Sequence, residues 1–210
     1  MSTIKTNQLV HTANGASVYT LPQTDGSAGQ VLKTDGSGNL SWVSQPTIPT
    51  GGLEMVDMWY LSSSKTLGTS ELAMSNSNAF NRASDTIVAS GIIGTGMTMS
   101  GQYFSFPSTG IYEITFQGEV QTSSQRRYVQ GDIYISTDGS NYTKRMDGIT
   151  AFPTDSGNVF TQVMLKYLFD VTNISTHKLY FTVKAEGSCT LRGDADVLRT
   201  HAIFKKLGET

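Results

Sequence analysis

Hydrophobic and polar residues alternate along two stretches in the middle of the chain. In Ile111–Val120, the residues Tyr112, Ile114 and Phe116 share one face, and mostly polar residues share the other. The stretch Tyr128–Ser136 repeats this pattern. A period of two residues is typical of a β-strand with one buried face, so both stretches are predicted to be strands that cover a core.

Further strands are predicted on either side of these two. Their β-branched and aromatic residues are bounded by Gly, Pro, Asn and Asp, and Asp138-Gly139 marks one tight turn. A short helix within Thr69–Arg82 is the rival interpretation there, and we expect almost no helix in the chain. Many short strands with regular turns predict an all-β sandwich. The other expected strands are Met55–Leu61, Thr86–Ile93, Tyr103–Phe106, Tyr142–Arg145, Val159–Val171, Lys178–Ala185 and Val197–Leu207.

The first 43 residues carry a short internal repeat and lack a core of their own. Each repeat unit, 23–32 and 33–42, places Asp-Gly before a small β-prone stretch. Asp-Gly favours turns because both residues tolerate positive φ. Because these short stretches bury too little apolar surface to be stable alone, the segment is expected to bind other proteins or other subunits. The residues expected to anchor it are Val31, Leu32, Leu40 and Trp42; the alternative is a flexible Gly/Ser linker.

Residues 44–52 are interpreted as a linker between two parts of the chain. They include two prolines, which favour an extended backbone, and two glycines, which loosen it. The sequence therefore predicts a small extended β segment for attachment or oligomerisation at 1–43, a linker at 44–52 and a sandwich head domain at 53–210.

Composition and charge exclude several classes of partner. Charged residues make up only 15% of the chain and its net charge is −2, so nothing provides the basic field that a nucleic-acid backbone requires. The chain has a single cysteine, Cys189, which rules out an internal disulfide framework. No apolar run approaches the ~20 residues of a membrane helix, and the N-terminus lacks a signal-peptide core. We expect neither nucleic-acid binding nor membrane insertion.

No arrangement of residues in the sequence indicates an enzyme. The three histidines are scattered, without the spacing of metal ligands. Asp194 and Asp196 could supply oxygen ligands to Ca²⁺, but two carboxylates are too few to assert a site. Nothing sets any pair of carboxylates apart as the acid and base of a glycan hydrolase. We therefore assign no catalytic residue, no metal ligand and no cofactor.

The segment leading into the central strand resembles the C1q/TNF-like jelly roll. That family carries an aromatic residue, a proline, a glycine and a tyrosine at the positions that Phe104, Pro107, Gly110 and Tyr112 occupy here. The closing segment Ala202–Gly208 looks like the last strand of the family. The resemblance implies a ten-stranded jelly-roll sandwich for the head and a compact homotrimer.

The segment Thr24–Val43 resembles the Asp-Gly-Ser, Gly-Gln-Val-Leu and Leu-x-Trp segment of marine and other bacteriophage fibre proteins. In those proteins it precedes a C-terminal knob. The resemblance implies a structural virion protein of a tailed phage, a trimeric fibre or spike held by other virion proteins through its N-terminal segment. Such a protein is assembled in the host cytoplasm and exposed on the particle surface.

Antiparallel strands run between two opposite ends of a sandwich, which predicts where the loops gather. Counting back from the last strand, Thr122–Arg127, Asp147–Asn158 and Ser188–Asp196 share the end away from the linker, and the Asp138-Gly139 turn lies at the other end. Loops on a rigid sandwich are common binding sites, so this end is expected to contact the host surface, with glycan as the ligand. The alternative is solvated turns. The proposed contacts are Gln125, Arg126, Arg127, Phe152, Asp155, Arg192 and Asp194.

Tyr180 and Phe181 point to opposite faces of one strand, so one of the two rings faces away from the core. A subunit contact that covers this outward ring would support a trimer.

Two other functions remain open at this level. A capsid or baseplate decoration protein without receptor binding fits the same fold and the short N-terminal segment. The third possibility is a free carbohydrate-binding module or a glycan depolymerase.

Overall fold

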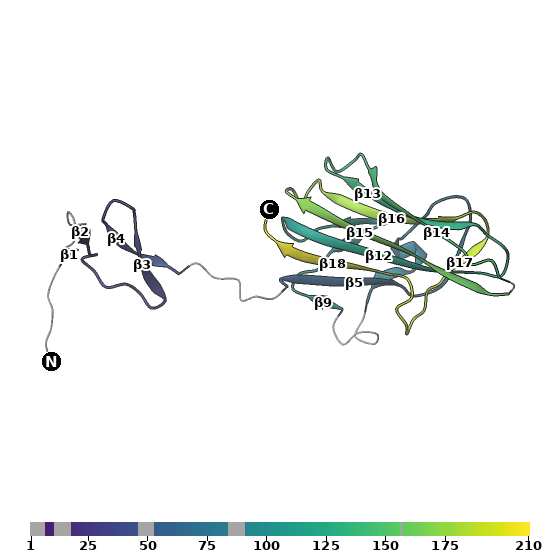
Figure 1. Cartoon of the computed structure of the whole chain (residues 1–210), viewed down its shortest axis with the longest axis horizontal. Coiled ribbons are helices and arrows are strands. Elements are labelled where there is room, and N and C mark those ends of the chain that lie inside the picture. The colour runs from purple at the N-terminus through teal and green to yellow at the C-terminus, as the bar shows by residue number, and fades with distance from the viewer. Residues whose placement is uncertain (1–6, 11–17, 46–52, 84–90, 156) are drawn as a thin grey trace. The chain divides into compact units, whose positions relative to one another are not determined.

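The computed structural model describes residues 7–10, 18–45, 53–83, 91–155 and 157–210 (Figure 1). Its internal contacts divide the chain into two units, Met1–Gly52 and Leu53–Thr210.

The N-terminal unit consists of two small antiparallel hairpins. Its strands are β1 (Gln8–Val10), which pairs with β2 (Val18–Thr20), and β3 (Gln30–Thr34), which pairs with β4 (Leu40–Ser44). A parallel bridge between Thr20 and Asn39 joins the two hairpins. None of the described side chains in this unit is buried. The two strands expected around Val31 and Trp42 are therefore confirmed, as β3 and β4.

The C-terminal unit, called the head here, contains two antiparallel sheets that face each other. The larger sheet has eight strands and lies nearer the viewer in Figure 1. Its strands are β5 (Met55–Leu61), β6 (Lys65–Leu67), β8 (Phe80–Arg82), β9 (Ile92–Ile93), β12 (Gly110–Thr122), β15 (Val159–Val171), β17 (Cys189–Leu191) and β18 (His201–Gly208). The long strand β12 pairs with β15 along one edge and with β17 and β18 along the other.

The second sheet has six strands, with β16 and β13 at its centre. Its strands are β7 (Leu72–Ala73), β10 (Thr98–Ser100), β11 (Tyr103–Ser105), β13 (Tyr128–Ser136), β14 (Thr143–Ala151) and β16 (Lys178–Ala185). A single 3-10 turn, Asn76–Asn78, is the one helical element among the described residues. The segment Thr69–Arg82 therefore forms two short strands and this turn rather than an α-helix.

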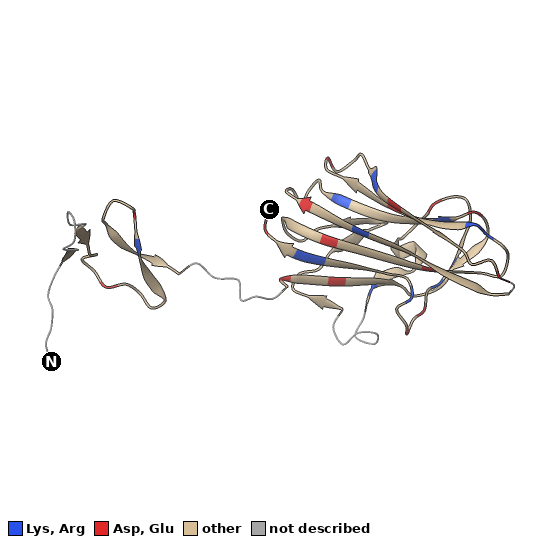
Figure 2. Cartoon of the chain, viewed as in Figure 1, with Lys and Arg blue, Asp and Glu red and all other residues tan. Residues whose placement is uncertain are grey.

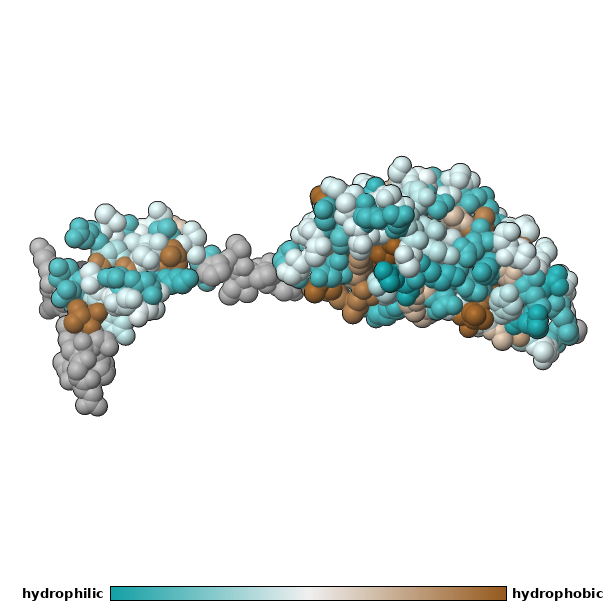
Figure 3. Space-filling model, turned by 90° about the horizontal axis from the view of Figure 1, so that it is seen from above, coloured by the Kyte–Doolittle hydropathy of each residue, from teal (hydrophilic) through white to brown (hydrophobic). Residues whose placement is uncertain are grey.

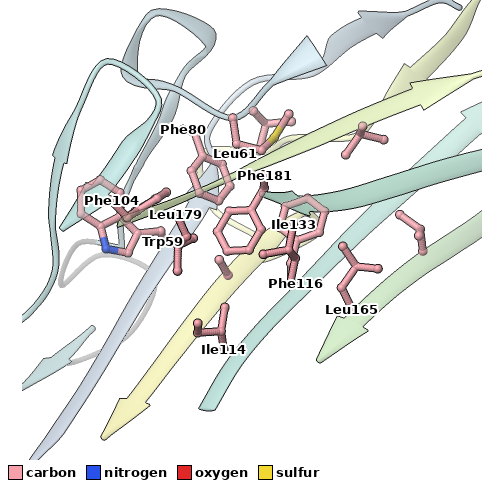
Figure 4. Close-up of a cluster of buried hydrophobic side chains, with 14 of the residues drawn as sticks. Trp59, Leu61, Phe80, Phe104, Ile114, Phe116, Ile133, Leu165, Leu179 and Phe181 are labelled. Atoms are coloured by element: carbon pink, nitrogen blue, oxygen red, sulfur yellow. The ribbon is translucent and has the colours of Figure 1, made fainter. Parts of the chain in front are cut away.

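Aromatic residues from both sheets fill the space between them (Figure 4). Phe104 lies at the centre, with its ring 5.1 Å from that of Trp59, 5.8 Å from that of Phe181 and 5.0 Å from that of Phe204. Phe181 also stacks on Phe116 at 5.0 Å. These contacts join β11 and β16 of one sheet to β5, β12 and β18 of the other, so the two sheets share one hydrophobic core.

The predicted alternation is confirmed on the central strands. Tyr112, Ile114 and Phe116 on β12 are fully buried, and Ile133 on β13 faces the same core. An all-β sandwich with its core between two sheets is the predicted fold class.

Some predicted strand boundaries were wrong. The last strand was expected over Val197–Leu207, but β18 begins at His201 because the preceding residues form a loop closed by the carboxylate of Asp194. The strand expected at Tyr142–Arg145 is β14, which starts at Thr143 and runs on to Ala151. Most of the expected strand Thr86–Ile93 lies outside the described residues, and its last two residues form β9.

Candidate functional site

Strand register brings three loops together at one end of the head. Thr122 of β12 lies opposite Val159 of β15, and Val129 of β13 lies opposite Ala185 of β16. The described segments 123–127, 152–155, 157–158 and 186–188 therefore lie at the same end. Of the predicted loops, Asp147–Asn158 is shorter because β14 runs to Ala151, and Ser188–Asp196 is interrupted by β17. The turn at Asp138 lies at the opposite end, near the chain termini of the head, as predicted, because Ser136 pairs with Lys178.

A pocket of about 460 Å³ opens among these loops. It brings together four of the predicted contact residues, and its lining is Gln125, Arg126, Arg127, Ala151, Phe152, Thr154 and Glu186. We call it the loop-end pocket. Residues from three separate segments of the chain form its wall, so its shape depends on the fold of the whole head.

Glu186 holds Arg127 in place at the rim of the pocket. The Arg127 backbone N–H donates to a Glu186 carboxylate oxygen at 2.6 Å, and the exposed guanidinium of Arg127 pairs with the other oxygen. These hydrogen bonds lower the pKa of Glu186 below its ordinary value of 4.5. Sequence reasoning did not find Glu186, because it follows β16, 59 residues from Arg127.

Arg126 lies flat against the backbone at Gly187. A Cβ atom at Gly187 would come within 2.8 Å of Arg126 Nε, so only glycine allows this close approach. The Nε atom is buried and has no hydrogen-bond partner among the described residues, while Nη1 donates to the Gln125 carbonyl at 3.0 Å. Cys189 lies beside it, and burial raises the pKa of its thiol.

Phe152 is a core residue, which corrects the prediction that it is an exposed contact. Its side chain is only 5% exposed and belongs to the main hydrophobic cluster. Its N–H donates to the Arg127 carbonyl at 3.2 Å, which turns the ring inward at the end of β14. Phe152 therefore forms part of the pocket lining without presenting a free ring to a ligand.

The structure does not place Asp155, Arg192 or Asp194 in the loop-end pocket. Asp155 is exposed on the 152–158 loop but is not part of the lining. Arg192 pairs with Glu119, and its guanidinium lies 4.9 Å from the centre of the Phe160 ring. Arg192, Glu119 and Phe160 line a separate pocket of about 350 Å³ on the larger sheet, which we call the Arg192 pocket.

Asp194 organises its own loop instead of facing outward. Its carboxylate accepts hydrogen bonds from the Asp196 N–H at 3.0 Å and from Arg199 Nε at 3.3 Å, and both lower its pKa. Its own N–H donates to the Leu61 carbonyl. The predicted contact set is therefore divided among the loop-end pocket, the Arg192 pocket and this internal loop, with Asp155 exposed outside all three.

Four tyrosines cover part of the outward face of the smaller sheet. Tyr180 stacks on Tyr134 at 4.7 Å and makes edge contacts with Tyr103 and Tyr142. Burial raises the pKa of Tyr180 to about 12. Because neighbouring rings of the same chain already cover Tyr180, it gives no support to a subunit contact.

The outward face of the larger sheet carries the apolar side chains that such a contact requires. Phe160, Met164 and Leu168 recur at every fourth residue along β15, and their side chains are 47%, 61% and 60% exposed. Ile111 on β12 and Leu207 on β18 are also exposed on this sheet. We call these five residues of β12, β15 and β18 the apolar sheet face. Figure 3 shows hydrophobic side chains gathered in patches on the surface of the head.

Charges on the apolar sheet face are paired with one another. Glu113 on β12 accepts from Lys166 on β15 at 2.7 Å and from Lys205 on β18 at 3.2 Å. Figure 2 shows the acidic band on β12 between basic bands on β15 and β18. Lys166 is the largest cause of the lowered pKa of Glu113, followed by Lys205.

The predicted anchoring residues lie on the β3–β4 hairpin. Val31 and Leu32 are 39% and 43% exposed, whereas Leu40 and Trp42 are half-buried. Trp42 Nε1 donates to the Thr24 carbonyl at 2.9 Å, and the indole packs against Gly26. The first Asp-Gly of the repeat thus forms the surface beneath Trp42, and the second, at Asp35, forms the hairpin turn.

Within the described part of the chain, no group of three or more His, Cys, Asp or Glu side chains could hold a metal ion. No helix of the described residues has the length and apolar character needed to cross a membrane.

No protein-family model matches the chain, and no curated protein matches it in sequence. Among solved structures, Eiger TNF from S. frugiperda matches with a TM-score of 0.53 and 11% identity, over 76% of this chain and 96% of that chain. The head has a TNF-like jelly-roll fold. Two structures of murine APRIL, at pH 5.0 and pH 8.5, give TM-scores of 0.46 and 0.43 at 14% and 12% identity, each covering 73% of this chain and 98% of its own. The match to Eiger TNF, with the two packed sheets, confirms the jelly-roll head predicted from the sequence.

Proposed function

We propose that the protein is a structural virion protein of a tailed phage: a homotrimeric fibre or spike whose jelly-roll head contacts the host surface. The observation that carries the proposal is the apolar sheet face, where Phe160, Met164 and Leu168 are exposed in a row along β15. Exposed apolar patches of this kind mark interaction surfaces on proteins.

A second copy of the chain is the occupant that fits this face best. β15 is a 13-residue strand that, among the described ladders, pairs with β12 alone, so its other edge has no strand ladder, although β14 of the smaller sheet packs beside it. Open edges of long strands favour association and are normally covered. The charged groups on the face, such as Glu113 with Lys166, already neutralise each other within one chain, which lowers the cost of burying them.

The trimer is tested by placing charges on this face. We expect Met164→Glu with Leu168→Glu to reduce the mass measured by light scattering from three chains to one, because carboxylates cannot be buried there without partners. The matched control is Ile149→Glu on β14, which is 62% exposed on the other sheet and should leave the trimer intact. A wild-type protein that is monomeric at micromolar concentration would contradict the proposal.

Attachment to the particle is assigned to the N-terminal unit. The resemblance of Thr24–Val43 to phage fibre segments supports this role, as does the absence of a buried side chain among the described residues of the unit. Exposed apolar residues such as Val31 and Leu32 gain from contact with another virion protein. Imaging of particles with a label on the head tests the assignment: density at the tail supports a fibre, and density over the shell supports a decoration protein.

Host contact is assigned to the loop-end pocket, because its loops lie at the end of the head opposite to Leu53, where the chain continues to the N-terminal unit. Arg126→Ala with Arg127→Ala should weaken adsorption to host cells without lowering the midpoint of thermal unfolding. Phe152 is excluded from this test because its ring is buried. Unchanged adsorption would remove the pocket from the proposal, and turnover of a polysaccharide by the wild-type protein would favour a depolymerase instead.

A further inference from the structure

The loop-end pocket has one cation whose charge is not paired. Arg127 is neutralised by Glu186, which is the one acidic residue of the lining. Arg126 makes no direct salt bridge among the described residues, although its charge also acts on Glu186 and helps to lower that pKa. Two arginines and one glutamate therefore leave the lining with an excess positive charge, and Arg126 is the arginine without a direct carboxylate contact.

The guanidinium of Arg126 is held in a fixed place and has donors to spare. Contact with Gly187 and the hydrogen bond to the Gln125 carbonyl set its position. Its Nε–H has no acceptor among the described residues but is buried against Gly187, so a ligand would have to use the N–H groups of Nη1 and Nη2. A positioned guanidinium with free N–H groups matches the geometry of an oxyanion, which it can bind through two parallel hydrogen bonds.

The rest of the lining is suited to a sugar. The side chains of Gln125 and Thr154 can hydrogen-bond hydroxyl groups, and Ala151 provides an apolar patch. The volume of about 460 Å³ is within the range of small-ligand sites. We propose that the pocket binds an acidic sugar of a surface polysaccharide, with its carboxylate or sulfate on Arg126. This inference rests on the proposed host-contact function and names the class of ligand.

The experiment measures binding of the full-length protein to immobilised polygalacturonate, a sulfated galactan and a neutral galactan. We expect the acidic polymers to bind and the neutral one to bind weakly, and binding should fall as NaCl is raised. Comparison of the carboxylated and sulfated polymers identifies the preferred oxyanion. Loss of a hydrogen-bonded charge pair should weaken binding by roughly tenfold or more in Arg126→Met, which keeps the aliphatic part of the side chain.

Two further variants separate the role of Arg126 from general effects of charge. Gly187→Ala keeps every charge but displaces the guanidinium, so it should weaken acidic-polymer binding as well. Arg145→Ala removes an exposed arginine of β14 that is outside the pocket and should change nothing.

The outcomes distinguish this inference from the function on which it rests. Equal binding of acidic and neutral polymers, or unchanged binding in Arg126→Met, overturns the acidic-sugar inference, even if the protein still adsorbs to host cells. Failure of the wild-type protein to adsorb to host cells overturns the host-contact function itself.

Discussion

At the scale of single residues, Asp57 on β5 is a buried carboxylate that requires several hydrogen-bond donors. Its side chain is completely buried, yet both of its carboxylate oxygens accept hydrogen bonds. Arg82 donates from Nε and Nη2 at 2.9 and 3.0 Å, Trp59 Nε1 donates at 3.0 Å and the Met97 N–H at 2.7 Å. One carboxylate thus joins β5, β8 and the loop before β10. The strand was predictable from sequence, but this network was not, because its members lie up to 40 residues apart.

Asp57→Ala should lower the free energy of unfolding by about 3–5 kcal/mol, because it leaves Arg82 without its partner and two buried donors, Trp59 Nε1 and the Met97 N–H, unpaired. Urea unfolding followed by tryptophan fluorescence measures the change, and Trp59 reports on the site directly. The control is Asp147→Ala, an exposed carboxylate on β14, which should change stability by less than about 0.5 kcal/mol. A cost for Asp57→Ala as small as that of the control would contradict the assigned network.

At the scale of elements, sequence patterns found the long strands and missed several of the short ones, although β11 was predicted as Tyr103–Phe106. β13, β15 and β16 match the predicted ranges residue for residue, because each is long enough to show alternation or a sustained run of β-prone residues. β17 has only three residues, too few to show a period, and it pairs with β12 and β6 in register with distant parts of the chain. Short strands of this kind are specified by tertiary contacts.

Close packing between elements depends on a pair of glycines that no sequence pattern singles out. Gly131 of β13 lies opposite Gly148 of β14, and both lie beneath β15. A Cβ at Gly148 would lie 2.7 Å from Leu165 Cδ2, and one at Gly131 would lie 3.2 Å from Val163 Cγ2. The absence of side chains here lets the smaller sheet approach β15.

Gly148→Val should therefore destabilise the head by about 1–3 kcal/mol, because the added methyl groups push β14 away from β15 in a well-packed core. Differential scanning calorimetry measures the change. Thr143→Val introduces the same side chain at an exposed position of the same strand and should have little effect. A Gly148→Val protein as stable as wild type would show that the two sheets can separate here without cost.

At the scale of the whole molecule, strand order predicted which loops meet, and side-chain contacts decided which residues face a ligand. Antiparallel connectivity was enough to bring Gln125, Arg126 and Arg127 to one end of the head. It could not show that Phe152 turns inward or that Glu186 neutralises Arg127, since both depend on packing between loops distant in sequence. The exposed row on β15 was also missed, because the aromatic pair Tyr180-Phe181 gave a more obvious signal on the other sheet.

The division into two units leads to a prediction about how the chain folds. Every buried hydrophobic residue of the described structure lies between Met55 and Phe204, so the head contains its entire core. A fragment of residues 53–210 should therefore unfold cooperatively at the same midpoint as the full chain. It should also remain trimeric, because the row on β15 is retained. Circular dichroism and light scattering measure these two properties.

The peptide 1–52 alone should give no cooperative transition, because none of its described side chains is buried. A fragment that aggregates or melts well below the full chain would mean that the N-terminal unit stabilises the head, and the unit would then be part of the fold rather than an attachment segment.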